Sequence, residues 1–263
     1  MVKSAALSPT YAGHASFDYL HDAQNVLEHV KRRSFAALAL RGGERVADVG
    51  AGTGVDAVAL ARLVGPTGRV YAVDNDAEFT AAYVTTGVLD AGVYPLHADA
   101  QDLPFEDEAL DAVRAERLLL HVSNALSAVR QFHRVLKPGG RVVLLESDFA
   151  SLSVNTSLPH VERVLRSVAV TDALRNGMAG RRLTEYLQDA SFRDVSVESF
   201  AFSTRDERLA RRLLVFDALE RSARDAGRLT HAEVFAWRED LRARHDGGRF
   251  FASITMHMVT ARR

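Results

Sequence analysis

The sequence predicts an α/β protein with a doubly wound, mostly parallel sheet that is covered by helices on both faces. Between Arg45 and Glu146, short apolar runs with a strand-like period alternate with stretches of helical period. Glycine, proline or aspartate stands at the joints between these runs. Strands and helices that alternate in this order form parallel pairs, so the pattern predicts a parallel sheet.

The composition is that of an ordinary globular domain. The 263 residues include 47% hydrophobic and 25% charged residues, which fits one domain with an added cap. The net charge of -1 and the even spread of charge predict no nucleic-acid partner. No apolar run reaches the ~18 residues of a membrane span. Without cysteine or an N-terminal apolar region, the chain is expected to be cytoplasmic.

The first half of the chain predicts a helical lid followed by the alternating core. Apolar residues at helical spacing indicate a helix from about residue 16 to 40, so residues 1–40 are expected to form an N-terminal helical lid. The expected strands of the core are 45–49, 69–73, 94–97, 110–114 and 141–146. The expected helices between them are 55–64, 77–89 and 123–136. Together these elements make up most of a doubly wound domain that spans residues 41–263.

After residue 146 the regular alternation of strand and helix patterns ends. Residues 147–159 are loop-like, and helical patterns follow at 161–174 and 182–189. Two more strands, 195–202 and 250–261, lie on either side of a helix-rich stretch. These two strands bring the predicted sheet to seven and fit an antiparallel pair at its edge, with one strand antiparallel to the rest. Helical cap insertions are expected at about 147–180 and 205–246.

A glycine-rich turn, GAGTG at 50–54, joins the first strand of the core to its first helix. Glycines there let a ligand approach the backbone and the helix N-terminal amides, although a turn of this kind can also lack a ligand. The spacing is G-x-G-x-G, whereas the dinucleotide fingerprint would put its third glycine at Val55. The turn therefore fits a nicotinamide site imperfectly.

Asp74 ends the second strand of the core, 20 residues after Gly54. A carboxylate at this place can accept hydrogen bonds from both hydroxyls of a ribose. It can also simply cap the helix that follows. The glycine-rich turn and Asp74 together favour a cofactor with an adenosyl group.

Four segments carry a more specific pattern: VADVGAGTGVDAVALA (46–61), GRVYAVDND (68–76), HADAQDLPFEDEALDAV (97–113) and RVLKPGGRVVLLE (134–146). In order and spacing they resemble the class I S-adenosylmethionine-dependent methyltransferases. The similarity is to the branch that contains ubiquinone and menaquinone C-methyltransferases and many natural-product methyltransferases. The resemblance implies a Rossmann-like fold and S-adenosyl-L-methionine as the cofactor.

Carried over by position, the resemblance assigns the methionine end of the cofactor to the first βα turn. It implies that Gly50, Ala51 and Gly52 line the methionine moiety. It further implies that Asp48 orients the turn and reaches the amino group of the cofactor through water.

The resemblance assigns the adenosyl end to the turns after the second and third strands. It implies that Asp74 binds the ribose and that Asn75 borders the adenine. It also implies that Asp99 accepts a hydrogen bond from the adenine amino group, and that the amide of Ala100 meets a ring nitrogen.

The segment 115–121, AERLLLH, departs from the family pattern of a small polar residue, Glu and paired histidines. Arg117 takes the acidic position and Leu120 replaces the first histidine. Arg117 can bind the methionine carboxylate or an acidic substrate, or it can pair with neighbouring Glu116. His121 is the candidate general base for a phenol or hydroxyl acceptor, and the alternative is a histidine that only packs at a helix start.

Two aromatic residues of the N-terminal segment, Tyr11 and Tyr19, are candidate lid or substrate contacts. Tyr19 can lie against the sulfonium as a cation-π partner, and ordinary packing in a helical stripe is the alternative. No metal site is predicted, because the spacing of acids and histidines matches no ligand set.

The predicted function is methyl transfer to a small-molecule acceptor through an oxygen, carbon or nitrogen nucleophile. This is an in-line displacement, to which a protein contributes mainly alignment and exclusion of water. The alanine- and arginine-rich composition suggests a high-GC bacterium, and natural-product biosynthesis is the expected setting. A quinone or lipid C-methyltransferase and a non-methylating protein that binds S-adenosylmethionine are the alternatives. The sequence leaves the oligomeric state open, a homo-oligomer included.

Overall fold

The computed structural model describes residues 26–82, 88–89 and 91–263, and within these ranges seven strands form a single sheet. The strand order is β3-β2-β1-β4-β5-β7-β6. The strands are β1 (Arg45–Val49), β2 (Arg69–Asp74), β3 (Val93–His97), β4 (Leu110–Glu116), β5 (Leu136–Val154), β6 (Arg193–Thr204) and β7 (Ala252–Arg262). The strands β1 to β5 pair in parallel, and β7 runs antiparallel to both β5 and β6. The predicted fold class is confirmed, with β7 and β6 as the antiparallel edge pair.

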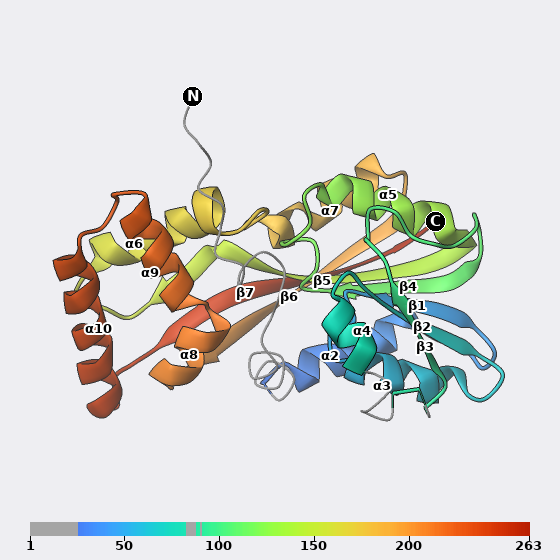
Figure 1. The fold of residues 1–263 in the computed structure, drawn as a ribbon, viewed down its shortest axis with the longest axis horizontal. Helices are drawn as coiled ribbons and strands as arrows, with labels where there is room; N and C mark the ends of the chain where they lie inside the picture. The colour runs from blue at the N-terminus through green and yellow to red at the C-terminus, as the bar shows by residue number, and fades with distance from the viewer. Residues whose placement is uncertain (1–25, 83–87, 90) are drawn as a thin grey trace.

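Helices cover the sheet on both faces. In Figure 1, α5 and α7 lie over one face, while α2, α3 and α4 lie under the other. The helices are α2 (Glu28–Leu38), α3 (Val55–Val64), α4 (Ala77–Ala82), α5 (Ala125–Val135), α6 (Pro159–Val168), the π-helix η2 (Ala169–Ala173), α7 (Ala179–Asp189), α8 (Glu207–Leu213), α9 (Phe216–Asp225) and α10 (His231–Asp246). The helix predicted over 77–89 is described as far as residue 82, and 83–87 lie outside the described residues.

Helix α5 shows how the sequence specifies these elements. The side chain of Asn124 accepts a hydrogen bond from the amide of Ser127 and so caps the first turn. The buried side chains recur at helical spacing: Ala125, Ala128, Val129, Phe132 and Val135. This single apolar stripe faces the sheet, so the hydrophobic effect fixes the rotation of the helix.

Strand β5 is longer than the sequence predicts. Residues 147–159 were expected as a loop, but β5 continues through Val154 and pairs there with Ala252 of β7. The side chains of Phe149, Leu152 and Val154 are buried. The loop prediction is wrong because this pairing joins segments about 100 residues apart, which a local pattern does not reveal.

The extended ends of β5, β7 and β6 carry a separate group of helices. Figure 1 shows α6, α8, α9 and α10 gathered at one end of the molecule, away from α3 and α4. These helices fall in the two stretches for which cap insertions are expected. Within the described ranges, no helix is long and apolar enough to cross a membrane.

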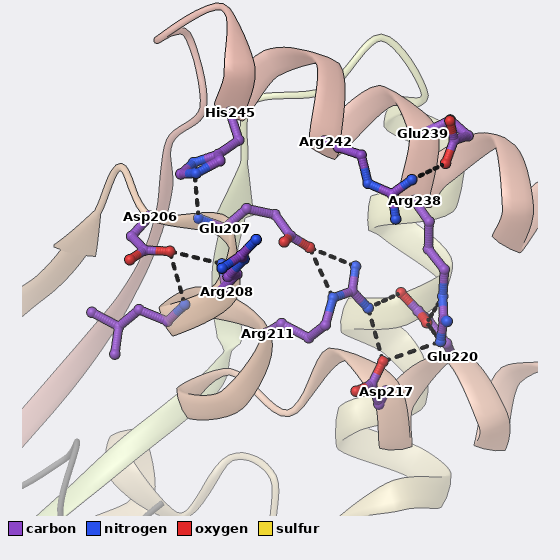
Figure 2. A network of polar contacts seen from close by, with 11 residues as sticks. Asp206, Glu207, Arg208, Arg211, Asp217, Glu220, Arg238, Glu239, Arg242 and His245 are labelled. Carbon is purple, nitrogen blue, oxygen red and sulfur yellow. Dashed lines mark hydrogen bonds and ion pairs between the residues drawn. The ribbon is translucent and has the colours of Figure 1, made fainter.

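Ion pairs join three of these cap helices, as Figure 2 shows. Arg211 of α8 lies 3.0 Å from Glu220 of α9 and 2.9 Å from Asp217. Arg238 of α10 donates to the other carboxylate oxygen of Glu220 at 2.7 Å. Because Glu220 is buried and bridges two arginines, it ties α8, α9 and α10 into one unit.

Candidate active site

A cavity of ≈ 320 Å³ lies where β1, β2, β3 and β4 end. The carboxyl ends of parallel strands meet at one edge of such a sheet, and ligands bind there in open α/β folds. The cavity brings together the ten described residues to which the sequence assigns a role: Asp48, Gly50, Ala51, Gly52, Asp74, Asn75, Asp99, Ala100, Arg117 and His121. The lid candidates Tyr11 and Tyr19 lie outside the described residues.

The glycine-rich turn is held in a conformation that favours glycine. Gly50 has a φ of 76°, and a Cβ at this position would come within 3.0 Å of the Leu118 side chain. The amide of Gly52 donates to a carboxylate oxygen of Asp74 at 2.8 Å. The other oxygen of Asp74 accepts from the Asp76 amide, and burial raises the pKa of Asp74. Asp74 therefore orders the turn and lies in the cavity wall at the same time.

The turn after β3 forms the opposite wall. The carboxylate of Asp99 accepts hydrogen bonds from the amide of Gln101 and from its side chain. The side-chain oxygen of Gln101 accepts from Ser123 and from the amide of Asn124. These bonds tie the exit of β3 to the start of α5 and fix the position of Asp99.

The floor of the cavity contains a buried arginine that the sequence analysis missed. Arg114 of β4 lies 3.0 Å from Asp48 of β1 and 3.2 Å from Asp56 of α3. Its guanidinium also pairs with Glu116 and donates to the Ser34 hydroxyl of α2 at 3.1 Å. Arg114 thus links four elements beneath the glycine-rich turn.

Electrostatics keep this cluster ionised although it is buried. Burial lowers the pKa of Arg114, but the surrounding carboxylates outweigh burial and raise it above its usual range. Burial raises the pKa of Asp48. For Glu116, the nearby Arg114, Arg117 and Lys31 outweigh burial and lower the pKa. Lys31 of α2 completes the cluster at 2.7 Å from Asp56.

A signal for Arg114 was present in the sequence. It is the only arginine of the predicted strand 110–114, and a charge inside a buried strand needs a partner. The positions of Lys31 and Asp56 give no such signal, because both stand on amphipathic helices where charges are common.

Arg117 makes the ion pair with Glu116 that its sequence context allowed, and a contact with a ligand stays a prediction. Its Nε lies 3.2 Å from Glu116, so the ion pair is present. The residue has a φ of 50° and still lines the cavity. Pairing with Glu116 therefore does not remove Arg117 from the ligand space.

His121 lies on the same wall and is held neutral. Burial lowers the pKa of His121 to about 4, and the positive charges of Arg117 and Arg175 add to this. At this pKa the imidazole is neutral at ordinary pH and keeps a lone pair on one ring nitrogen, but it is a weaker base than a free histidine. No group of three or more metal-binding side chains is found among the described residues.

The turn that carries His121 is fixed from two sides. The amide of Leu119 donates to the buried carboxylate of Glu146 at 2.6 Å. Burial raises the pKa of Glu146 to about 8. The side-chain amide of Asn176 donates to the carbonyls of Leu119 and Val122 at 2.8 and 2.9 Å. These bonds fix the backbone of the turn on which His121 stands.

Known proteins match both the sequence and the fold. Residues 47–144 match the model of a methyltransferase domain family. An uncharacterized 37.1 kDa protein in transposon TN4556 of Streptomyces fradiae is 34% identical over 86% of this chain and 64% of its own length. The demethylmenaquinone methyltransferase of Staphylococcus aureus is 34% identical over 52% of this chain and 58% of its own length. The chain therefore spans less than two thirds of these curated relatives.

A solved structure supports the fold over almost the whole chain. The Haemonchus contortus phosphoethanolamine N-methyltransferase 2 in complex with S-adenosyl-L-methionine has a TM-score of 0.58 and 17% identity. The match covers 93% of this chain and 56% of that one. Residues 47–144 therefore carry a methyltransferase domain, and the resemblance of the motifs to the class I S-adenosylmethionine-dependent methyltransferases is confirmed. The solved structure adds that the fold is shared.

Proposed function

We propose that this domain transfers the methyl group of S-adenosylmethionine to a small organic acceptor. The observation that carries the proposal is the cavity itself, in which the glycine-rich turn, Asp74 and Asp99 meet at the carboxyl ends of neighbouring strands. Its ≈ 320 Å³ falls in the range of small-ligand sites, about 300–1,000 Å³. A role in bacterial natural-product biosynthesis is part of this proposal.

The residues present fit the cofactor. Gly50 would lie beside the methionine moiety, since the absence of a side chain lets this lining turn pack against Leu118 without a clash. Asp74 would accept from the ribose hydroxyls, since its oxygens have lone pairs beyond the two bonds to Gly52 and Asp76. Asp99 would bind the adenine amino group, with Asn75 and Ala100 beside the ring. When bound, S-adenosylmethionine supplies an electrophilic methyl group.

The protein's part in the transfer is alignment and proton acceptance. The turn 117–121 brings Arg117 and His121 to the side of the cavity opposite Asp74 and Asp99 in the strand order. His121, being neutral, would accept the proton of a hydroxyl as its oxygen attacks. The buried floor around Arg114 would exclude water from the reacting atoms.

The test of cofactor binding is calorimetric titration with S-adenosylhomocysteine and, in parallel, with NAD. We expect micromolar binding of S-adenosylhomocysteine alone. Asp74→Ala should weaken this binding by about 1–3 kcal/mol, because charge-assisted hydrogen bonds to the ribose are lost. The control Asp225→Ala removes an exposed acid of α9 and should bind as the wild type does. Binding of NAD alone, or unchanged affinity in Asp74→Ala, would contradict the proposal.

The test of the base uses methyl-labelled S-adenosylmethionine and a panel of phenols, alcohols, amines and carbon acids. With a hydroxyl acceptor, His121→Ala should keep the affinity for S-adenosylhomocysteine and lower turnover by about 10²–10⁴-fold. The control His160→Ala removes an exposed histidine of α6 and should turn over normally. A fully active His121→Ala would point to a carbon or amine acceptor that needs no base.

A quinone acceptor is the second candidate. It is favoured by the 34% identity to a demethylmenaquinone methyltransferase, although that match covers only 52% of this chain. Incubation with demethylmenaquinone and labelled cofactor would decide between the candidates. Label transferred to the quinone, and to no water-soluble acceptor of the panel, would favour this second function.

A further inference from the structure

The wall of the cavity beyond β4 carries a guanidinium that the described chain does not neutralise. Arg175 lines the cavity and is exposed. Its side chain forms no hydrogen bond or ion pair in the part of the chain that the structure describes. An uncompensated guanidinium that faces a ligand cavity is a binding group for an anion.

The other cations of the cavity are already matched by carboxylates. Arg114 pairs with Asp48, Asp56 and Glu116, and Lys31 pairs with Asp56. Arg117 pairs with Glu116 as well. Among the cavity-lining cations of the described residues, Arg175 is therefore the one without an acidic partner.

The backbone around Arg175 is fixed. The amide of Asn176 donates to the carbonyl of Leu120 at 3.2 Å, and its side chain holds Leu119 and Val122. On the other side, a Cβ at Gly177 would lie 2.4 Å from the carbonyl oxygen of Ala169. The backbone at Gly177 therefore packs closely against η2. Asn176, next to Arg175, binds the turn that carries His121.

Arg175 belongs to the acceptor half of the cavity. The candidate cofactor residues Asp74 and Asp99 follow β2 and β3, which lie on one side of β1 in the sheet. Arg175 follows η2, and its neighbour Asn176 donates to Leu120 in the turn after β4, which lies on the other side of β1. Both Arg117 and Arg175 depress the pKa of His121, so all three groups share one electrostatic environment.

We infer that the methyl acceptor carries a carboxylate, which Arg175 binds while the reacting atom of the acceptor faces His121. The planar guanidinium matches a carboxylate with two parallel hydrogen bonds. This inference rests on the proposed function, because it assigns a chemical class to the acceptor of the same site. The ion pair with Arg175 would orient the acceptor by its carboxylate. The opposite end of the acceptor would then be free to approach the methyl group.

The test compares acids with their own amides on protein saturated with S-adenosylhomocysteine. Calorimetric titrations use benzoate and benzamide, 4-hydroxybenzoate and 4-hydroxybenzamide, and propionate and propionamide. We expect at least one acid to bind the wild type about tenfold or more tightly than its amide, since one charge-assisted hydrogen bond is worth about that ratio. In Arg175→Gln, the preference for that acid should fall below about twofold.

The matched control is Arg163→Gln. Arg163 is an exposed arginine of α6 that does not line the cavity, so this variant makes the same charge change and should keep the preference. Circular dichroism confirms that both variants fold. All three proteins should bind S-adenosylhomocysteine with equal affinity.

Three results would overturn the inference. They are a wild type that prefers none of the acids, an Arg175→Gln variant that retains the preference, and an Arg175→Gln variant that binds S-adenosylhomocysteine about tenfold more weakly. The last would assign Arg175 to the methionine carboxylate of the cofactor. A wild type that does not bind S-adenosylhomocysteine would instead contradict the proposed function, so the two failures are distinguishable.

Discussion

The molecule contains two arginine-centred networks of ion pairs, and they differ in their distance from water. Around Arg114, the side chains of Arg114, Asp48 and Glu116 are only 2%, 3% and 5% exposed. In the cap network of Figure 2, Glu220 is 1% exposed, but its partner Arg238 is 46% exposed. The first network lies under the cavity, whereas the second binds cap helices to one another.

This difference in exposure to water determines how strongly the members of each network depend on one another. A buried charge that loses its partner has nothing to replace it, so the parts of the first network depend on one another. In the second network, water reaches Arg238 and can solvate its guanidinium when it loses its partner. We therefore expect the Arg114 network to couple stability to the cofactor site, and the cap network to affect stability alone.

Removal of Arg114 should have the largest effect. Arg114→Met leaves Asp48, Asp56 and Glu116 without their shared counter-charge, which should lower the free energy of unfolding by about 3–5 kcal/mol in urea titrations. Affinity for S-adenosylhomocysteine should fall as well. If Arg114→Met does not fold, Arg114→Lys keeps a positive charge in place. It should lose less of the free energy of unfolding and less affinity for S-adenosylhomocysteine. A loss of stability below about 1 kcal/mol in Arg114→Met would show that the buried network is not cooperative.

Glu146 sharpens the comparison, because it is buried beside the cavity without any ion pair to a described residue. Its pKa of about 8 in the folded state lies above the value of ~4.3 in an unfolded chain. Between these values the folded state holds a proton that the unfolded state has released. The free energy of unfolding should therefore fall as pH rises, by at most about 1.4 kcal/mol per pH unit.

Glu146→Gln should remove this contribution, because an amide does not ionise. The stability of the variant relative to the wild type should increase from pH 5 to pH 8, as measured by urea unfolding at several pH values. Other titrating groups are common to both proteins and cancel in the difference. A difference that stays constant over this range would mean that Glu146 is ionised in the folded protein.

The cap network should give the smallest effect. Glu220→Gln removes the central charge but leaves Arg211 and Arg238 their contacts with Asp217, so we expect a loss of about 1–2 kcal/mol. Affinity for S-adenosylhomocysteine should not change. The exposed pair of Arg242 and Glu239 is the control, and Arg242→Ala should change stability by less than about 0.5 kcal/mol. Weaker cofactor binding in Glu220→Gln would break the proposed separation of the two networks.

Much of the fold could be predicted because its signals are local. The alternation of strand and helix periods in 45–146 predicts the core, and the structure has β1 to β4 within two residues of the expected bounds. The glycine-rich turn and Asp74 are adjacent in space because parallel strands end at one edge. Fixed spacing along the chain is enough to place such residues together.

The charge network and the true length of β5 could not be predicted in the same way. Arg114 stands 66 residues from Asp48 and 80 from Ser34, so its partners are set by the packing of β1 and α2 against β4. The carboxylate of Glu146 meets an amide 27 residues away. Such contacts depend on how the elements pack against one another. The periodicity within one element does not indicate which other elements it will meet.

The sequence by itself determined the order of the elements, the parallel core and the position of the candidate cofactor turn, because each follows from local period and spacing. The class of the domain came from the resemblance of four segments to a known family. Only the tertiary structure decided which charges neutralise one another. It buried Arg114 among acids, held His121 neutral, and left Arg175 unmatched in the cavity wall. The physical reason is that pairing and desolvation depend on distances through space, which are fixed only when the sheet, helices and cap have packed.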